Sequence, residues 1–70
     1  MYDYKVVREV LKEEDVGEYK TYGIQIGDYI IHDISLNEKE ICELIDRMNL
    51  YQLSPIHLNE VVEDFLEENY

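Results

Sequence analysis

The feature that most constrains the fold of this chain is a change of hydrophobic period at Ser35. Before this serine, apolar residues alternate with polar ones, as Tyr22, Ile24 and Ile26 do, and such alternation is typical of a strand with one buried face. After it, apolar residues recur three and four positions apart, first at Ile41, Leu44, Ile45 and Met48. This second spacing is typical of an amphipathic helix. The chain is therefore expected to bury one side of a small sheet under helices.

The first half of the chain predicts three strands. Residues 2–11 are rich in Tyr and Val, and the polar segment 13–18, which contains a glycine, is a typical turn. Residues 22–26 predict a second strand, the glycine and aspartate at 27–28 a tight turn, and residues 29–34 a third strand. We expect these strands to form an antiparallel meander.

The second half predicts two helices. Ser35 and Glu38 match a capping box, in which each side chain satisfies the other residue's backbone amide, so the first helix should begin at Ser35 and stop near Asn49. Ser54 before Pro55 is a second start signal, because proline at the first helical position leaves no amide unpaired. The apolar residues of the second helix are Leu58, Val61, Val62, Phe65 and Leu66. The predicted fold class is α+β, a three-stranded antiparallel meander followed by two helices packed on one face.

The length of the chain and its single cysteine limit its class. Residues 1–70 suffice for one modest core, so we expect a single small domain. Cys42 has no second cysteine with which to form an internal disulfide, which fits a reducing compartment. The N-terminus lacks the features of a signal peptide, and no apolar stretch approaches the roughly 20 residues needed to span a bilayer. We therefore expect a complete cytoplasmic protein without membrane association.

The charge balance limits the partners. Seventeen acidic residues against six basic ones give a formal net charge of −11. This charge opposes binding to a phosphate backbone or to an anionic membrane, so we expect no direct contact with nucleic acid. The complementary partner is a basic protein surface, including one on a protein that otherwise binds nucleic acid.

The acidic residues concentrate in two segments. No Lys or Arg follows Arg47, and the final helix carries carboxylates at i, i+4 spacing, such as Glu60 with Asp64. Each such pair costs roughly 0.2–0.5 kcal/mol, and the end of a helix disfavours anions, so helix stability does not explain them. Either a function in partner binding or simple solubility explains these acidic residues. The candidate partner-binding residues are Glu60, Glu63, Asp64, Glu67, Glu68 and Tyr70 at the C-terminus, with Glu13, Glu14 and Asp15 in the first turn.

No residue pattern indicates catalysis, a metal or a cofactor. His32, His57 and Cys42 lack the spacing of a metal site, and Cys42 has no neighbouring base that would activate a thiol. The alternation of the third strand places His32 between Ile30 and Ile34 on one face, where it is expected to be partly buried. We expect no catalytic residue, no metal and no cofactor.

The seven tyrosines are of a residue type enriched at protein interfaces, although they also suit the half-exposed face of a small sheet. If both helices pack on one face, the other face has no cover. The third strand then leaves either Tyr29 and Ile31 or Ile30 and Ile34 on that face. An uncovered apolar face would be a surface for dimerisation or for a partner.

Three short segments resemble a family of short uncharacterised proteins in clostridial and related bacteria. They are Tyr22-Gly23-Ile24, Asp33-Ile34-Ser35 and Val62-Glu63-Asp64-Phe65-Leu66. The resemblance implies a bacterial source, and it implies no site residues because the family has no assigned activity. In size and charge the chain also resembles small acidic inhibitors of phages and mobile elements, including anti-CRISPR proteins and nucleic-acid mimics.

The leading hypothesis is a non-enzymatic binding module that docks its acidic residues, with tyrosines as anchors, on a basic protein surface. Electrostatic steering would make the association fast and sensitive to salt. The alternative is a homodimeric structural or accessory protein whose uncovered sheet face pairs with a second copy.

Overall fold

The computed structural model of the chain describes residues 1–68. The elements are β1 (Lys5–Glu13), β2 (Gly17–Ile26), β3 (Tyr29–Ser35), α1 (Glu38–Leu50), a short 3-10 helix (Pro55–His57) and α2 (Leu58–Glu68). The strands form one antiparallel sheet in the order β1-β2-β3. The predicted α+β fold, β-β-β-α-α, is confirmed.

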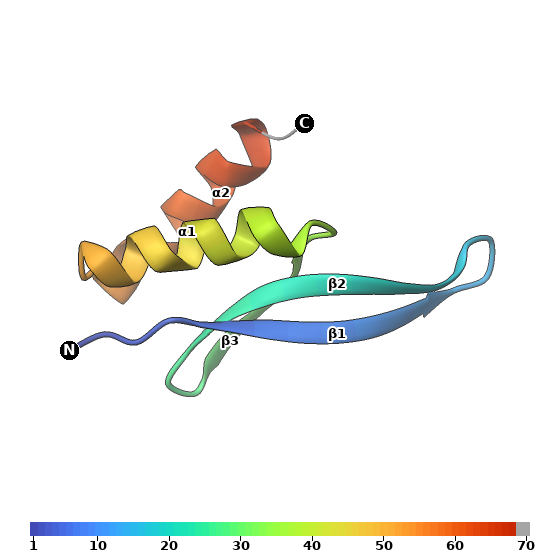
Figure 1. Cartoon of the computed structure of the whole chain (residues 1–70), viewed down its shortest axis with the longest axis horizontal. Coiled ribbons are helices and arrows are strands. Elements are labelled where there is room, and N and C mark those ends of the chain that lie inside the picture. Colours follow the sequence, from blue (N-terminus) through green and yellow to red (C-terminus); the bar gives the residue numbers. More distant parts are fainter. Residues whose placement is uncertain (69–70) are drawn as a thin grey trace.

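The two helices lie on the same side of the sheet (Figure 1). α1 contacts all three strands, and α2 meets the sheet where the Tyr29 hydroxyl donates to Asn59 Oδ1 at 3.3 Å. The apolar positions predicted for α1 are all buried, and those of α2 are buried or half-buried. The core consists of Tyr4, Ile24, Ile34, Ile41, Leu44, Ile45, Met48, Leu58, Val62 and Phe65.

The start of α1 differs from the prediction. Asn37, not Ser35, is the N-cap, and its side chain accepts from the backbone amide of Glu40 at 3.2 Å. Ser35 pairs with Tyr22 as the last residue of β3, so its backbone is committed to the sheet and the chain needs two further residues to turn into a helix. The Ser35 hydroxyl instead accepts from the Asn37 amide at 3.0 Å. The capping box of Ser35 and Glu38 was therefore a wrong prediction.

The end of α1 is tied to the N-terminal segment. The helix runs one residue past Asn49, whose side chain accepts from the Tyr4 amide at 2.7 Å and donates to the Tyr4 carbonyl at 3.0 Å. Gln52 makes the same pair of bonds with Tyr2, both at 2.9 Å. The buried Tyr4 ring also donates its hydroxyl to the Leu53 carbonyl at 2.8 Å. These bonds satisfy the backbone ahead of β1 without any strand partner.

An irregularity in β3 decides which of its side chains reach the core. Ile31 pairs with Ile24 and Ser35 with Tyr22, so residues 32–34 stand opposite a single residue of β2. That residue is Gly23, where an added Cβ would clash with the Ile31 carbonyl oxygen.

The extra residues turn Ile34 back toward the core beside Ile31. Asp33 adopts a φ of 53° at this point. The expected placement of Ile30 and Ile34 on one face is therefore wrong, because the irregularity reverses the alternation between them. His32 is exposed rather than partly buried, and its Nδ1 lies 2.7 Å from Glu9 Oε1 on the uncovered face.

The β1–β2 hairpin extends past the end of β3. β1 pairs with β2 as far as Glu13 and Gly17, whereas β3 pairs with β2 only from Tyr22 onward. The hairpin tip therefore projects to the right of the helices in Figure 1. Gly17 enters β2 with a φ of 83°, a conformation that glycine adopts without strain.

Candidate functional site

A groove of about 580 Å³ lies beside the projecting hairpin. We call it the acidic groove. It is bounded by the hairpin tip, by the junction of β3 with α1, and by the last turns of α2. The residues that line it are Glu13, Val16, Tyr19, Asp33, Ile34, Ser35, Leu36, Asn37, Glu40, Phe65 and Leu66.

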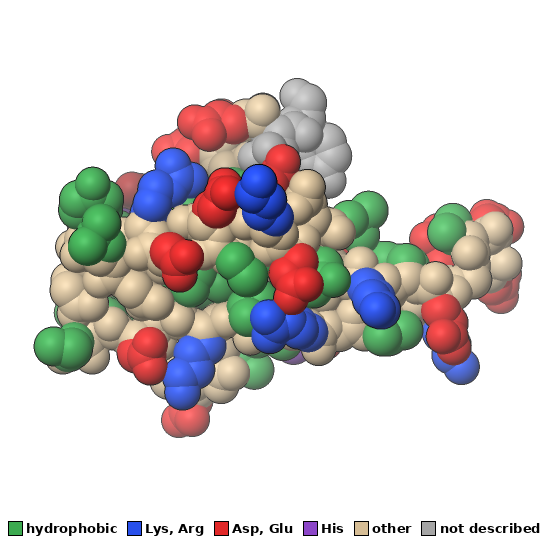
Figure 2. All heavy atoms as spheres, in the orientation of Figure 1, with side chains coloured by type: hydrophobic (Ala, Val, Ile, Leu, Met, Phe, Trp, Pro, Cys, Tyr) green, Lys and Arg blue, Asp and Glu red, His purple; other side chains and the backbone are tan. Residues whose placement is uncertain are grey.

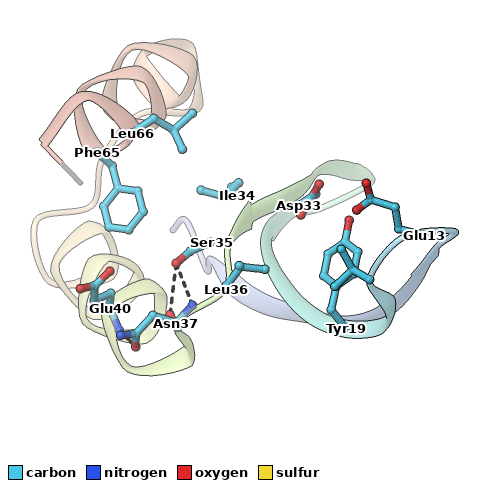
Figure 3. Close-up of a pocket in the computed structure, with 11 residues that line it drawn as sticks. Glu13, Tyr19, Asp33, Ile34, Ser35, Leu36, Asn37, Glu40, Phe65 and Leu66 are labelled. Carbon is cyan, nitrogen blue, oxygen red and sulfur yellow. Dashed lines mark hydrogen bonds between the residues drawn. The ribbon is translucent and has the colours of Figure 1, made fainter. Parts of the chain in front are cut away.

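One wall of the acidic groove carries polar groups from the uncovered face of the sheet. Figure 3 shows the Tyr19 ring between Asp33 and Glu13. The Asp33 carboxylate accepts from the hydroxyl of the fully buried Thr21 at 2.6 Å, and the Ser35 carbonyl lies 3.3 Å from the same hydroxyl. Loss of hydration, followed by the charges of Asp33 and Glu13, raises the pKa of Tyr19. The phenol therefore keeps its proton and remains a hydrogen-bond donor beside two acceptors.

The opposite wall combines apolar side chains with the polar residues Ser35, Asn37 and Glu40. In Figure 3 Ile34 and Leu36 lie on the β3–α1 side, and Phe65 and Leu66 reach in from α2. Leu36 is 69% exposed and Val16 at the hairpin tip is 67% exposed, although both are large aliphatic residues. Exposed apolar side chains that line a concavity are typical of a binding surface.

Among the described residues that line the acidic groove there is no Lys, Arg or His. Its charged residues are Glu13, Asp33 and Glu40, which come from the hairpin, β3 and α1. The groove therefore offers two carboxylates, those of Glu13 and Asp33, on one side, and apolar contact together with the Glu40 carboxylate on the other (Figure 3). A ligand that complements it carries positive charge next to apolar groups.

The predicted acidic residues of α2 lie together on one helix face. They are exposed and lie opposite the buried positions Leu58, Val62 and Phe65. Within residues 1–68, Glu60 has a weak partner in His57, at 3.7 Å, and the other four have no cation within ion-pair distance. Those four are Glu63, Asp64, Glu67 and Glu68. Tyr70 lies outside the described residues.

The predicted acidic residues of the first turn lie apart from those of α2. Glu13, Glu14 and Asp15 are exposed at the hairpin tip, and Figure 2 shows red side chains there and, separately, on α2. Glu13 is the one of these three that lines the groove together with Phe65 and Leu66. The fold therefore does not merge the two predicted clusters, and the acidic groove lies between them.

Sequence reasoning missed most of the groove. Asp33 and Glu40 reach it because of the irregular end of β3 and the late start of α1, neither of which the hydrophobic pattern indicates. Leu36 offered a weak signal, since it is an apolar residue between a predicted strand and a predicted helix start.

The residues considered for metal binding do not come together. His32 lies beside Glu9 and His57 beside Glu60, while Cys42 is half-buried against the core. Within residues 1–68 no three side chains of His, Cys, Asp or Glu gather so as to hold a metal ion. Within the described part of the chain, no helix is both long enough and apolar enough to cross a membrane.

Comparison with known proteins identifies one family. The model of DUF6514, a family of unknown function, matches residues 1–68. No curated protein and no solved structure matches the chain. The resemblance to a family without assigned activity is thereby confirmed, and its clostridial origin stays a prediction. Since the match extends over nearly the whole chain, the protein belongs to the family DUF6514.

Proposed function

We propose that this protein is a non-enzymatic binding module that docks on a basic protein surface and thereby occludes or regulates it. The observation that carries the proposal is the lining of the acidic groove, where carboxylates and apolar side chains of residues 1–68 meet without a cation from that part of the chain. Solubility alone needs carboxylates on convex surface and does not need exposed Leu36 and Val16 beside them.

The charge on α2 supports the same function. Glu63 and Glu67 are exposed four residues apart and have no compensating cation among the described residues. Like charges at this spacing and near a helix C-terminus are unfavourable for the isolated helix. A basic partner would offset the repulsion between these carboxylates by attracting them. The same charge would steer the partner toward the module.

The partner class follows from this chemistry. A basic surface with apolar groups next to its cations occurs on many nucleic-acid-binding proteins. An acidic module of this size could cover such a surface in the manner of a small inhibitor or nucleic-acid mimic. Its cellular setting would be the cytoplasm of a bacterium.

Two matched double variants test the proposal. E63Q/E67Q removes two carboxylates from α2, and E43Q/D46N removes two from the exposed side of α1. The wild-type chain is used to capture its partner from the source cells at low and high salt, and the affinity of the purified partner is then measured by calorimetry. We expect weaker binding for E63Q/E67Q than for E43Q/D46N, and weaker binding at high salt. Equal affinities for both variants, at every salt concentration, would mean that the α2 charge serves solubility alone.

A homodimeric accessory protein is the second candidate. The observation in its favour is a set of exposed apolar residues at the end of the molecule opposite the hairpin tip, where α1 ends and the N-terminus lies (Figure 1). They are Leu50, Tyr51 and Ile56, exposed by 73%, 77% and 81%. Sedimentation at several protein and salt concentrations distinguishes the two functions. Apolar self-association of an acidic protein tightens with added salt, whereas docking on a basic surface weakens.

A further inference from the structure

The acidic groove borders a stretch of β2 that has a strand on one side only. β3 begins to pair with β2 at Tyr22, so residues 17–21 have no β3 partner. On the other side they pair with β1 in continuous register. This half of β2 is therefore an open sheet edge, even though β2 is the central strand of the sheet.

The register identifies the backbone groups that point to this edge. Ile26 and Tyr29 close the two-residue turn between β2 and β3, and a closing pair of this kind exchanges backbone hydrogen bonds. Because alternate residues direct their amides and carbonyls to the same side, Lys20 and Glu18 point theirs toward the line of β3 as Ile26 does. No backbone hydrogen bond outside the ladders involves either residue within the described part of the chain.

The acidic groove adjoins this edge at Tyr19. Tyr19 from the open half of β2 lines the groove, and so do Ser35 and Leu36, at which β3 leaves the sheet and turns into α1. The groove thus lies next to the line along which β3 would continue if it did not turn. An extended segment laid there would be a strand neighbour of β2.

We infer that the acidic groove receives an extended cationic segment of the partner, which adds to the open edge of β2 as a strand. This inference rests on the proposed function and specifies how the partner is held. Side chains of a strand alternate between the two faces of the sheet. One row of the added strand therefore faces Asp33 and Glu13, and the other faces Leu36 and Leu66 (Figure 3).

This arrangement predicts the pattern of the ligand. Lys or Arg at every second position would meet the acidic wall, and aliphatic residues between them would meet the apolar wall. A second copy of this chain is a poor occupant, because each copy carries a formal charge of −11 and the groove itself is acidic. The ligand is therefore a basic segment of another protein.

The probe is an amidated peptide of roughly seven residues in which lysine and valine alternate. Its control has the same composition, with all lysines placed before all valines. We expect the alternating peptide to bind roughly tenfold more tightly than the control. We also expect amide hydrogen exchange at Glu18 and Lys20 to slow when it binds. The amides of Tyr19 and Thr21 point toward β1 and serve as internal controls.

Two variants test whether the peptide contacts the walls of the groove. L36S, at an exposed position, should reduce the preference for the alternating peptide over the control. E63Q/E67Q, which leaves the groove lining intact, should weaken both peptides equally. Circular dichroism of each variant verifies that the fold is retained.

The outcomes separate this inference from the function on which it rests. If both peptides bind equally and the amides of Glu18 and Lys20 stay unprotected, strand addition is wrong and electrostatic docking stands. If neither peptide binds at low salt, the proposed function fails as well. If these two amides become protected by raising the protein concentration without peptide, the edge pairs with a second copy and the assigned ligand is wrong.

Discussion

The two ends of β2 differ in cover although they belong to one continuous strand. At one end Ile24 is fully buried, between β1 and β3 and beneath α1. At the other end Lys20 is exposed, and its strand has one neighbour. The same β structure is thus a core element in one half and an open edge in the other, and the position at which β3 turns away decides which half is which.

The backbone of the two ends is satisfied in different ways. Ahead of β1, where no strand pairs with the chain, Asn49 and Gln52 bind the backbone of Tyr4 and Tyr2. Beside the open half of β2 no side chain takes this role among the described residues. The contrast between one satisfied segment and one open segment beside the acidic groove supports the proposal that the second receives a ligand.

The largest expected difference between the ends is in the effect of core truncation. I24A removes a buried side chain beneath α1, and we expect it to lower the free energy of unfolding by about 2–5 kcal/mol. V16A at the hairpin tip truncates a side chain that is 67% exposed and should change the free energy by less than about 0.5 kcal/mol. Urea unfolding of both variants measures the contrast. Similar losses would show that the hairpin tip takes part in the cooperative core.

A smaller difference in the free energy of unfolding is expected between two variants at the covered end of the molecule. N49A removes two bonds to the part-buried backbone of Tyr4 and should cost about 1–3 kcal/mol. Q52A removes the equivalent bonds to Tyr2 at an exposed position, where water replaces them, so its cost should be lower. Thermal unfolding of the two variants ranks them. A larger loss for Q52A would contradict the view that burial makes these bonds matter.

A substitution of Thr21 tests how the open end of β2 recognises the peptide. T21V keeps the shape of this fully buried side chain but removes the hydroxyl that donates to Asp33 and to the Ser35 carbonyl. We expect a loss of about 1 kcal/mol and a freer Asp33 carboxylate. The alternating peptide should then lose part of its advantage over the control peptide in calorimetry. An unchanged preference would show that the position of the Asp33 carboxylate does not affect recognition of the peptide.

The smallest expected effect concerns pH. Burial, followed by the nearby Tyr2, raises the pKa of Tyr4 above its ordinary value of 10.0. A raised folded-state pKa means that its contribution to stability is complete below pH 10 and is lost as the pH rises through the folded-state pKa. Stability measured from pH 8 to 11 should therefore fall at the alkaline end, and it should fall less in Y4F. An equal fall in Y4F would assign the effect to other groups.

The elements themselves were predictable because their signals are local. The alternation of Tyr22, Ile24 and Ile26 and the helical spacing from Ile41 onward each depend on neighbours within a few positions, and both patterns agree with the structure. The exposed acidic face of α2 follows from the same spacing. The start of α1 was missed because the capping signal at Ser35 competes with the pairing of that residue to Tyr22, which is a contact between distant parts of the chain.

The sequence alone therefore determines the order of the elements and the buried face of each helix, because hydrophobic period is a property of short segments. The acidic groove is not, because it depends on where β3 leaves β2 and on which residues α2 brings to that point. Such contacts join residues far apart in the chain, and they form only when the core has packed. Tertiary structure alone thus decided that Glu13, Asp33 and Leu36 would share one surface.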